Sequence, residues 1–508
     1  MRPLSARTRL ALRRHVGAGA ILVSGLALAA GCARTADRGG RKTIECWYPW
    51  GGEYAETLRK VIDAFHTTHP AIHVELSYAA NNLTSSQKLF LAIAASAAPD
   101  VTFVDGQQLA EWAARGALTD ITDDVRRAGL SREDFWLPRW QESTFGGRVY
   151  ALPWGADPNF AVAWNKQAFR EAGLDPERPP RTIAELDEFS RLLTKIDSQG
   201  RIVRMGVIPW SWFGYGNSIF SWGYAFGGDF YEPPHAGDAG AVGRVTAHHP
   251  KVVAALRWMA SYARQYDVRK VSAFQSRFVG LSNNPFYLGK VAICPVHITQ
   301  LRYIRRYAPT LEYGLTYMPS PPDGEFRSSW IGGWSLAIPR GAEASSEAFE
   351  LIRWMCASPE GTMALKEMHQ FPAYRKSPYY DTVRDDPDLS VFYEIVSNSR
   401  HVRTLMPAQG YLMELLRRGV EEALYGGRDA RAILEEVSAR SQQRLERVMA
   451  RRAGRRARQQ RERAAADHRQ DACATGRIPM IRQAAVAQPS RLCGCRSQAG
   501  CLCHQEAP

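Results

Sequence analysis

The sequence predicts an α/β protein built from two lobes that are joined by a hinge and separated by a cleft. After residue 42, strand-like and helix-like patterns alternate, which is typical of parallel strands with crossover helices. A chain of 508 residues is too long for one hydrophobic core. In the segment 151–169, Pro153 and Pro158 interrupt an apolar run, so the chain is extended, looped and extended again. We interpret this segment as the crossing between two lobes; the alternative is an ordinary loop of one large domain.

The net charge of +14 is concentrated at the two ends of the chain. Residues 1–31 carry five arginines and no acid, and residues 451–508 carry a net charge of +8. Residues 32–450 are therefore nearly neutral, with a net charge of +1. A protein that binds nucleic acid needs a basic surface on its folded body. We therefore expect no nucleic-acid partner.

The first 31 residues have the features of a secretory signal peptide. Arginines up to Arg14 precede a small and apolar stretch, 16–30, that is short for a membrane span. The stretch ends in Leu28-Ala29-Ala30-Gly31-Cys32, which resembles the lipobox of bacterial lipoproteins. This resemblance implies cleavage before Cys32, its lipidation and attachment to the cell membrane, with 32–41 as a tether. Ordinary cleaved secretion and an uncleaved membrane anchor are the alternatives.

The first part of the body alternates between strand and helix patterns. Strands are predicted at 42–47, 72–76 and 101–104, and helices at 53–65, 85–97 and 108–114. Parallel strands have their carboxyl ends at one edge of a sheet, and ligands approach that edge. The loops 48–52 and 105–108 follow two of these strands.

Several short motifs occur in a characteristic order between residues 42 and 450. They include Phe65 to Pro70 (F-x-x-x-x-P), Ala95 to Val101 (A-x-x-A-P-D-V), Trp164-Asn165-Lys166, Ala225 to Gly228, Leu288 to Ile293 and Gly332 to Pro339. In this order the motifs resemble the family 1 extracellular solute-binding proteins, the maltose-binding-protein relatives that feed ABC importers. The resemblance implies a type II periplasmic-binding-protein-like fold, in which two α/β lobes close around a solute. It also implies a monomer that hands this solute to the membrane subunits of an ABC permease.

The chain crosses between the lobes three times in this interpretation. After the first crossing, a helix over 182–194 begins with Thr182 as its N-cap and Glu185 in the capping-box position. Strands are predicted at 203–209, 291–294, 314–317 and 334–338, further crossings at 319–322 and 371–375, and helices at 250–266, at 345–357 and from 389 to about 450. We therefore assign 42–155 and 324–372 to lobe one, and 156–323 and 373–450 to lobe two.

Residues 451–508 differ in composition from the body. Arginine pairs and an Ala/Arg/Gln-rich stretch show no persistent helix or strand pattern, so we expect a disordered basic tail or an aberrant extension. Its Cys-x-Cys pairs at 493–495 and 501–503 match no strong zinc-ligand spacing, and we expect no metal and no cofactor. The body cysteines Cys46, Cys294 and Cys356 lie in separate predicted elements, and we expect them to be buried.

The predicted loops combine aromatic rings with polar side chains. The segment 210–217 contains four aromatic residues and two glycines; such rings either stack on a ligand or form a buried hydrophobic plug. No nucleophile elbow, zinc-protease, P-loop or dinucleotide motif occurs in the sequence. Asp105 and Asp157 are the loop acids that we consider for catalysis, and we expect them to accept hydrogen bonds from hydroxyl groups instead. We therefore expect no enzyme activity.

The resemblance also implies which residues contact the solute. Those at the family's ligand-contact regions are Trp50, Gly51, Asp105, Trp154, Asp157, Trp212, Tyr215, Asn217, His297, Gly333, Trp334, Arg375 and Tyr411. A sugar has apolar C–H faces and a rim of hydroxyl groups, which aromatic rings and polar side chains recognise respectively. Trp222 lies in a helical pattern and is expected in the core instead.

We therefore expect an exported, lipid-anchored protein that captures a carbohydrate, a di- or oligosaccharide, and delivers it to an ABC permease. A secreted carbohydrate-active enzyme or lectin is a different possibility, and an enzyme of this kind would need paired carboxylates in the cleft. The same fold with a polyamine would need several acids in the cleft, and with a glycerol-phosphate ester it would need a cation such as Arg375. The nearly neutral body and the Trp-rich loops favour a neutral, hydroxylated solute.

Overall fold

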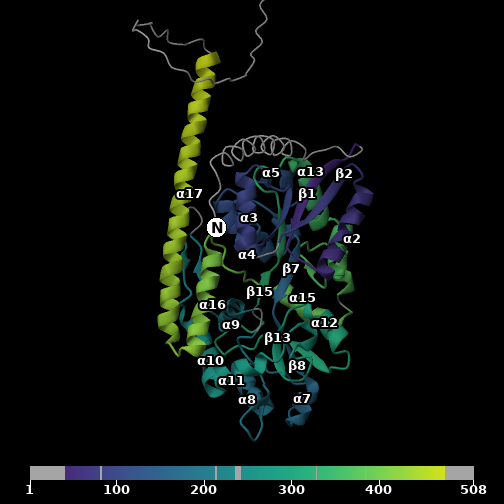
Figure 1. The fold of residues 1–508 in the computed structure, drawn as a ribbon, viewed down its shortest axis with the longest axis vertical. Helices are drawn as coiled ribbons and strands as arrows, with labels where there is room; N and C mark the ends of the chain where they lie inside the picture. The colour runs from purple at the N-terminus through teal and green to yellow at the C-terminus, as the bar shows by residue number, and fades with distance from the viewer. Residues whose placement is uncertain are drawn as a thin grey trace, which may run out of the picture. The chain divides into compact units, whose positions relative to one another are not determined.

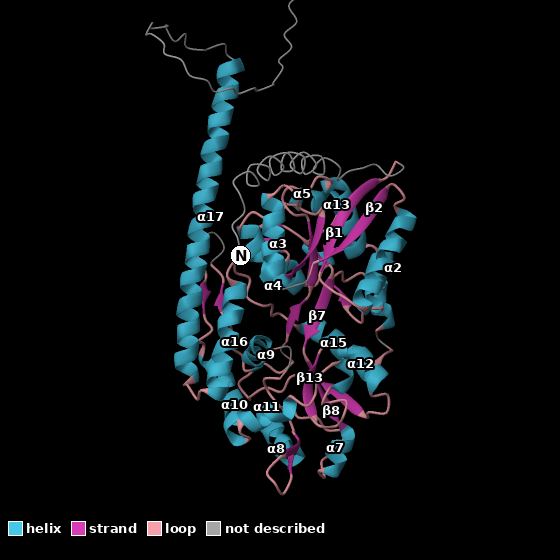
Figure 2. Cartoon of the chain, in the orientation of Figure 1, coloured by secondary structure: helices cyan, strands magenta, loops and turns pink. Residues whose placement is uncertain are grey.

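The computed structural model of the chain describes residues 40–79, 83–211, 214–234, 242–327, 329–383 and 385–474. By its internal contacts the chain divides into two compact units, Met1–Ala453 and Gly454–Pro508. The first unit contains two groups of strands with a smaller sheet between them (Figure 1). Helices surround both groups of strands (Figure 2).

A five-stranded sheet with the order β2-β1-β3-β16-β6 forms the first lobe. Its strands are β1 (Lys42–Tyr48), β2 (Ile72–Tyr78), β3 (Val101–Asp105), β6 (Leu152–Pro153) and β16 (Trp334–Ala337). The strands β1, β2 and β3 are parallel, as the strand–helix alternation predicts, whereas β16 is antiparallel to β3 and β6. The late strand β16 therefore returns to the sheet of the first strands and pairs Trp334 with Asp105.

Helices cover this sheet with their apolar faces. Helix α2 (Glu53–Thr68) buries Ala55, Leu58, Val61, Ile62 and Phe65, which have the helical spacing seen in the sequence. Helix α13 (Ser345–Ala357) has the predicted bounds and packs on β1, β6 and β16. The first lobe also contains α3 (Leu83–Ala94), α4 (Gly106–Ala114), α5 (Thr122–Arg127), α6 (Leu137–Glu142) and the hairpin β4 (Thr144–Phe145) and β5 (Arg148–Val149).

An antiparallel sheet with the order β13-β8-β14 forms the centre of the second lobe. Its strands are β8 (Ala161–Asn165), β13 (Ile293–Val296) and β14 (Tyr313–Thr316), and the central strand β8 is buried throughout. Helix α8 (Ile183–Leu193) begins with the predicted capping box, in which Thr182 and Glu185 satisfy each other's backbone N–H groups.

Other short elements complete the second lobe around this sheet. They are α7 (Lys166–Glu171), β9 (Lys195–Ile196), β10 (Ile202–Arg204), α9 (Tyr215–Ala225), β11 (Tyr231–Glu232), β12 (Arg244–Val245), α10 (Pro250–Gln265), α11 (Val268–Gln275), α12 (Gln300–Tyr307), α15 (Pro387–Asn398) and α16 (Gln409–Tyr425). The predicted strand over 203–209 is wrong in length. Only β10 and a single bridge from Met205 to Val291 form there, because Pro209 lacks a backbone N–H for pairing.

A small antiparallel sheet with the order β15-β7-β17 lies where the chain passes between the lobes. Its strands are β7 (Gly155–Asn159), β15 (Trp330–Gly332) and β17 (Phe371–Pro372), and β7 and β15 lie between the two larger groups of strands (Figure 1). Strands β7 and β17 lie within the predicted first and third crossings, 151–169 and 371–375. The third strand of this sheet is 330–332; no regular strand forms over 319–322, where three of the four residues are prolines without a donor for pairing.

The C-terminal helix differs from the sequence-based prediction. Helix α17 (Ala430–Ala474) continues beyond residue 450, where we predicted that regular structure ends. Residues 451–474 are rich in Ala and Arg, which are strong helix formers, and Arg458 pairs with Glu462 one turn later. Residues 475–508 of the predicted tail lie outside the described residues, as do Cys32 and the rest of 1–39.

Two predictions about buried residues are confirmed. Cys46, Cys294 and Cys356 are buried free thiols, and burial raises the pKa of each of them. Trp222 is also buried in the core, where its indole N–H donates to the Pro209 carbonyl. Within the described ranges, no helix is both long and apolar enough to span a membrane.

Candidate functional site

A cavity of about 490 Å³ lies between α2 of the first lobe and the loops of the second lobe. Among the described residues, Tyr54 at the start of α2 is the one lining residue from the first lobe. The other lining residues come from three second-lobe segments: the loop after β10, the segment from the end of α11 to Val291, and the start of α12. A volume of this size is typical of small-molecule binding sites.

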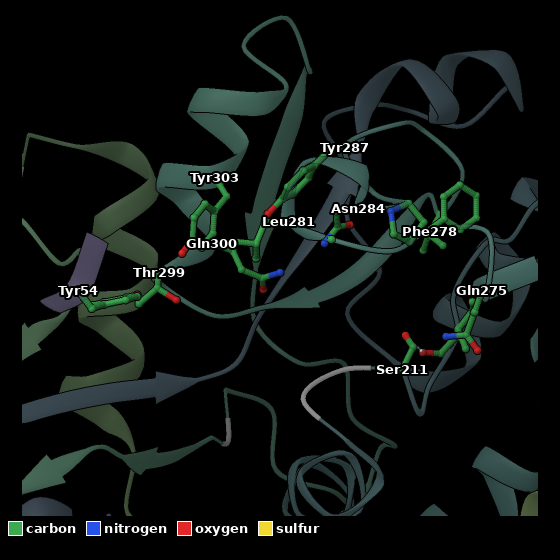
Figure 3. A pocket seen from close by; sticks show the side chains of 14 residues that line it. Tyr54, Ser211, Gln275, Phe278, Leu281, Asn284, Tyr287, Thr299, Gln300 and Tyr303 are labelled. Atoms are coloured by element: carbon green, nitrogen blue, oxygen red, sulfur yellow. Dashed lines mark hydrogen bonds between the residues drawn. The ribbon is translucent and has the colours of Figure 1, made fainter. Parts of the chain in front are cut away.

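The described lining of this cavity contains no charged side chain. Its polar members are hydroxyl and amide groups: Tyr54, Ser211, Gln275, Asn284, Tyr287, Thr299, Gln300 and Tyr303. The apolar part includes Phe278, Leu281, Ile208 and Val291. In Figure 3, Tyr54, Thr299 and Tyr303 lie at one end, and Ser211, Gln275 and Phe278 lie at the other. Such a lining can accept and donate hydrogen bonds and can cover apolar faces without imposing a charge on the ligand.

Three of the predicted site residues form one aromatic cluster beside this cavity. The ring of Trp50 lies 5.0 Å from Trp334 and 5.8 Å from Trp154 between ring centroids, and 4.9 Å from Phe103. Trp154 is fully buried and serves as core, whereas Trp50 and Trp334 are half-buried. Trp50 also lies 6.4 Å from Tyr54, which joins the cluster to the cavity.

Two predicted acids, Asp105 and Asp157, belong to a buried cluster of charges. Asp105 caps α4 by accepting a hydrogen bond from the backbone N–H of Gln107, and its carboxylate accepts one from Arg403 at 2.5 Å. Arg139 donates to the Gly155 carbonyl at 2.8 Å and pairs with Glu142. Burial lowers the pKa of Arg139 to about 10, although the charges of Asp157 and Asp105 oppose this shift.

Asp157 and His297 connect this charge cluster to the cavity. Burial raises the pKa of Asp157 to about 7, against the lowering effect of Arg139 and Arg403. Burial lowers the pKa of His297 to about 4, so its imidazole is neutral at neutral pH. His297 Nε2 lies 3.9 Å from Asp157 Oδ1, and His297 Nδ1 lies 2.9 Å from the hydroxyl of Thr299. Since Thr299 lines the cavity, Asp157 and His297 lie directly behind its wall.

Several polar atoms of this region have hydrogen-bonding capacity that the protein does not use. Trp154 Nε1, Asp157 Oδ1 and Arg403 Nε are buried and have no hydrogen-bond partner within the described part of the chain. Buried polar groups are normally paired with protein or with water. Trp154 Nε1 and Arg403 Nε can therefore donate, and Asp157 Oδ1 can accept, a further hydrogen bond with a ligand or with solvent.

The glycines beside this cluster permit close packing of the backbone. A Cβ on Gly333, where φ is 137°, would lie 2.5 Å from the Gly155 carbonyl oxygen, and a Cβ on Gly332 would lie 2.7 Å from the ring of Trp330. A side chain at position 333 would clash, so glycine there allows the backbone at Gly333 to pack closely against the backbone at Gly155. Gly51 is exposed and has open space around its Cα.

Four other predicted site residues are not brought to the cavity or to the aromatic cluster. Tyr215 lies against α16, where burial and a hydrogen bond with Tyr425 raise its pKa. Asn217 is half-buried in the first turn of α9. Arg375 is exposed and its guanidinium lies 5.1 Å from the ring centroid of Trp136.

Tyr411 is the fourth of these residues, and it faces Arg444 of α17. Trp212 lies outside the described residues. The arginine that pairs with the predicted acid Asp105 is Arg403 and not Arg375, because the segment before α16 returns to the crossing strands.

Sequence reasoning missed most of the cavity lining. Tyr54 lies just after the predicted Trp50 loop, and Thr299 and Gln300 lie just after His297, so a wider window around each motif includes them. The segment from Gln275 to Tyr287 carries no motif that distinguishes it from an ordinary surface loop, and nothing in the sequence pattern indicates its role.

Comparison with known proteins identifies the family of this fold. The family model described as bacterial extracellular solute-binding protein matches residues 51–363, which is more than half of the chain. This chain belongs to that family. The description of the family is of binding proteins that bacteria export.

Two curated relatives have the same name. The sn-glycerol-3-phosphate-binding periplasmic protein UgpB of Shigella flexneri is 25% identical over 324 residues, which cover 62% of this chain and 70% of that protein. The UgpB protein of Escherichia coli strain K12 is 24% identical over 323 residues, with the same coverage.

Solved structures show the same fold at low sequence identity. CpMnBP1 with mannotriose bound has a TM-score of 0.69 at 23% identity and covers 78% of this chain and 99% of its own. Maltose-bound MalE3 of T. maritima has a TM-score of 0.63 at 21% identity, covering 79% and 100%. The GacH receptor of Streptomyces glaucescens has a TM-score of 0.63 at 18% identity, covering 80% and 98%. The type II periplasmic-binding-protein-like fold predicted from the sequence is confirmed.

Proposed function

We propose that this protein captures a neutral carbohydrate, a di- or oligosaccharide, between its two lobes and delivers it to an ABC-type permease. The observation that carries this proposal is the uncharged cavity of about 490 Å³, whose polar lining consists of hydroxyl and amide groups. A sugar offers hydroxyl groups to such a lining and apolar C–H faces to rings such as Tyr303 and Phe278.

The positions of the buried arginines support a neutral solute. The buried arginines Arg139 and Arg403 are engaged with Glu142 and Asp105, and neither lines the cavity. A phosphate ester would need an arginine or a set of backbone N–H groups directed at it. The printed names of the structural neighbours, which include mannotriose and maltose complexes, point in the same direction.

A glycerol-phosphate ester is the second candidate. The curated relatives are named for sn-glycerol 3-phosphate, and Arg302 lies against two tyrosines that line the cavity. A solute with one phosphate could reach this guanidinium from the cavity only if Tyr54 or Tyr303 moves aside. The phosphate ester therefore requires a rearrangement of the cavity lining, whereas the neutral sugar does not.

The cellular setting extends the proposal. The family is exported, and we infer that Cys32 carries a lipid that holds a monomer at the outer face of the cell membrane or in the periplasm. The lobe boundaries at 155, 323 and 372 belong to the same proposal. So does recognition of the solute around Trp50 and Trp334, which lie beside the cavity, and around Asp157 and His297, which lie behind its wall. Binding without turnover is expected, as for other members of a family of binding proteins.

Thermal unfolding of the purified protein tests the proposed function. Mannotriose, maltotriose, smaller sugars and sn-glycerol 3-phosphate are added in turn, because a compound that binds only the native state stabilises it by about 2.7 kcal/mol at a hundredfold excess over Kd. We expect a rise of the midpoint with one sugar, and a smaller rise after Trp334→Ala. A rise with the phosphate ester alone, or release of shorter sugars during incubation, would replace this proposal by the second candidate or by an enzyme.

A further inference from the structure

One arginine is held between two tyrosines that line the cavity from opposite lobes. The Arg302 guanidinium carbon lies 4.5 Å from the ring centroid of Tyr54 in α2 and 4.6 Å from that of Tyr303 in α12. Arg302 also donates a hydrogen bond to the Tyr303 hydroxyl at 2.7 Å. Its side chain is only 13% exposed, so these cation–π contacts are partly desolvated.

A carboxylate of the first lobe completes this arrangement. Glu53 precedes Tyr54 in α2, and its carboxylate lies 3.3 Å from Arg302 and 2.5 Å from Arg306. Both arginines belong to α12, which follows β13 of the second lobe. We call Glu53, Tyr54, Arg302, Tyr303 and Arg306 the interlobe clasp.

The groups around Arg302 favour its charged form. Burial lowers the pKa of Arg302, but the hydrogen bond with Tyr303 and the charges of Tyr54, Tyr303 and Glu53 raise it above its ordinary value. Burial raises the pKa of Tyr54 to about 12, and Arg302 opposes this shift. Tyr54 is therefore neutral and Arg302 is charged across the physiological range.

We propose that Arg302 is a positioning residue for solute capture: through the clasp it holds Tyr54 and Tyr303 against the bound solute from the two lobes at once. This inference rests on the proposed function, and it names the contacts that hold the two lobes together around the solute. A solute that fills the cavity lies against Tyr54 and Tyr303, the two rings that the clasp holds. Solute binding and clasp formation therefore favour each other, since each reduces the freedom of the same two rings.

The test compares Arg302→Gln with a matched control on the same helix. Arg305 is also part of α12, but it pairs with Asp386 and Asp388 of the second lobe and is 47% exposed. Calorimetric titration with mannotriose and maltotriose is expected to show a roughly threefold to thirtyfold weaker Kd for Arg302→Gln, the range that cation–π contacts support. Arg305→Gln is expected to keep the wild-type Kd.

Further variants distinguish positioning from simple loss of packing. Arg302→Lys keeps the charge near Glu53 but loses the planar group between the rings, so it should restore only part of the affinity. Glu53→Gln combined with Arg302→Gln should cost less than the sum of the two single changes, because both remove the same bridge. Unchanged affinity of Arg302→Gln in a wild-type background that binds the sugar would overturn the clasp and leave the proposed function intact.

Small-angle scattering without solute decides the matter if no sugar binds. The Arg302→Gln/Arg306→Gln variant is expected to have a larger radius of gyration than wild type at an equal thermal midpoint, whereas Arg305→Gln is not. Identical scattering of all three proteins would overturn the clasp. The proposed function is tested separately, because it fails if the wild type binds no sugar in the titration.

Discussion

The neutral cavity and the buried charge cluster are neighbours with opposite chemistry. The cavity has no charged group among its described lining residues, whereas Asp105, Asp157, Arg139 and Arg403 lie together behind His297. The charges compensate one another through pairs such as Arg403 with Asp105. The charged residues near this cleft therefore join segments of the protein, and in the proposed function recognition falls to hydroxyl, amide and aromatic groups.

The largest expected effect is on stability and comes from the charge cluster. Arg139 and Glu142 are an ion pair with both side chains fully buried, so Arg139→Met leaves a buried carboxylate without its partner. We expect a loss of about 3–5 kcal/mol in the free energy of unfolding, measured by urea denaturation. The exposed pair of Arg126 and Asp123 is the control, and Arg126→Met should cost less than about 0.5 kcal/mol. Equal costs for the two variants would contradict a structural role of the cluster.

The second effect is a pH dependence in which Asp157 and His297 oppose each other. The native state keeps a proton on Asp157 that the unfolded chain releases between about pH 3.8 and 7, so this residue makes stability fall as pH rises. The unfolded chain protonates His297 below about pH 6.5, whereas the native state does so only near pH 4, so this residue makes stability fall as pH falls.

In the wild type, the effects of Asp157 and His297 on the free energy of unfolding largely cancel between about pH 4 and 6.5. Single variants of the two residues separate these effects. Relative to wild type, Asp157→Asn should gain stability as pH rises through this window, and His297→Gln should lose it. Each slope approaches about 1.4 kcal/mol per pH unit for one proton, measured by urea denaturation at stepped pH. Parallel curves for both variants and the wild type would show that these groups have ordinary pKa values.

The third effect concerns the apolar side of the cavity. Phe278 lines the cavity, and Phe278→Ala should weaken sugar binding by about 1 kcal/mol, or roughly fivefold in Kd, because one ring face is lost. Phe326 packs on Tyr317 and does not line the cavity, so Phe326→Ala is the control and should leave Kd unchanged. Titration calorimetry measures both; an equal loss in the two variants would place recognition elsewhere.

The smallest effect is expected at an exposed charge outside both regions. Arg375 lies over Trp136 on the surface, so Arg375→Ala should change the sugar Kd by less than about twofold. A large loss of affinity in the same titration would mean that Arg375 reaches the solute after all, as the sequence alone suggested, and that a charge contributes to recognition.

Local patterns made the individual elements predictable. The spacing of apolar residues in α2, the capping box at Thr182 and the bounds of α13 follow from interactions within a few residues, and the structure confirms them. The Arg-rich end of α17 was judged by its lack of an apolar face, and the intrinsic helix propensity of its residues was underestimated.

The candidate site was predictable only in part. Trp50, Trp154 and Trp334 form one cluster as expected of residues on strand ends of one sheet. Arg375 and Arg403 are equally plausible in the sequence, since both follow helical segments and lie near prolines. Only the return of the chain to the crossing strands brings Arg403, and not Arg375, to Asp105.

The sequence by itself determined the order of strands and helices, the neutrality of the body and the supply of aromatic and hydroxyl groups, because these depend on composition and on short-range periodicity. The tertiary structure decided which side chains meet: Asp105 with Arg403, 298 positions apart, and Glu53 with Arg306, 253 positions apart. Contacts over such separations depend on how whole lobes pack, and no local pattern encodes that. The uncharged cavity is therefore a property of the folded chain, formed where two lobes leave space between them.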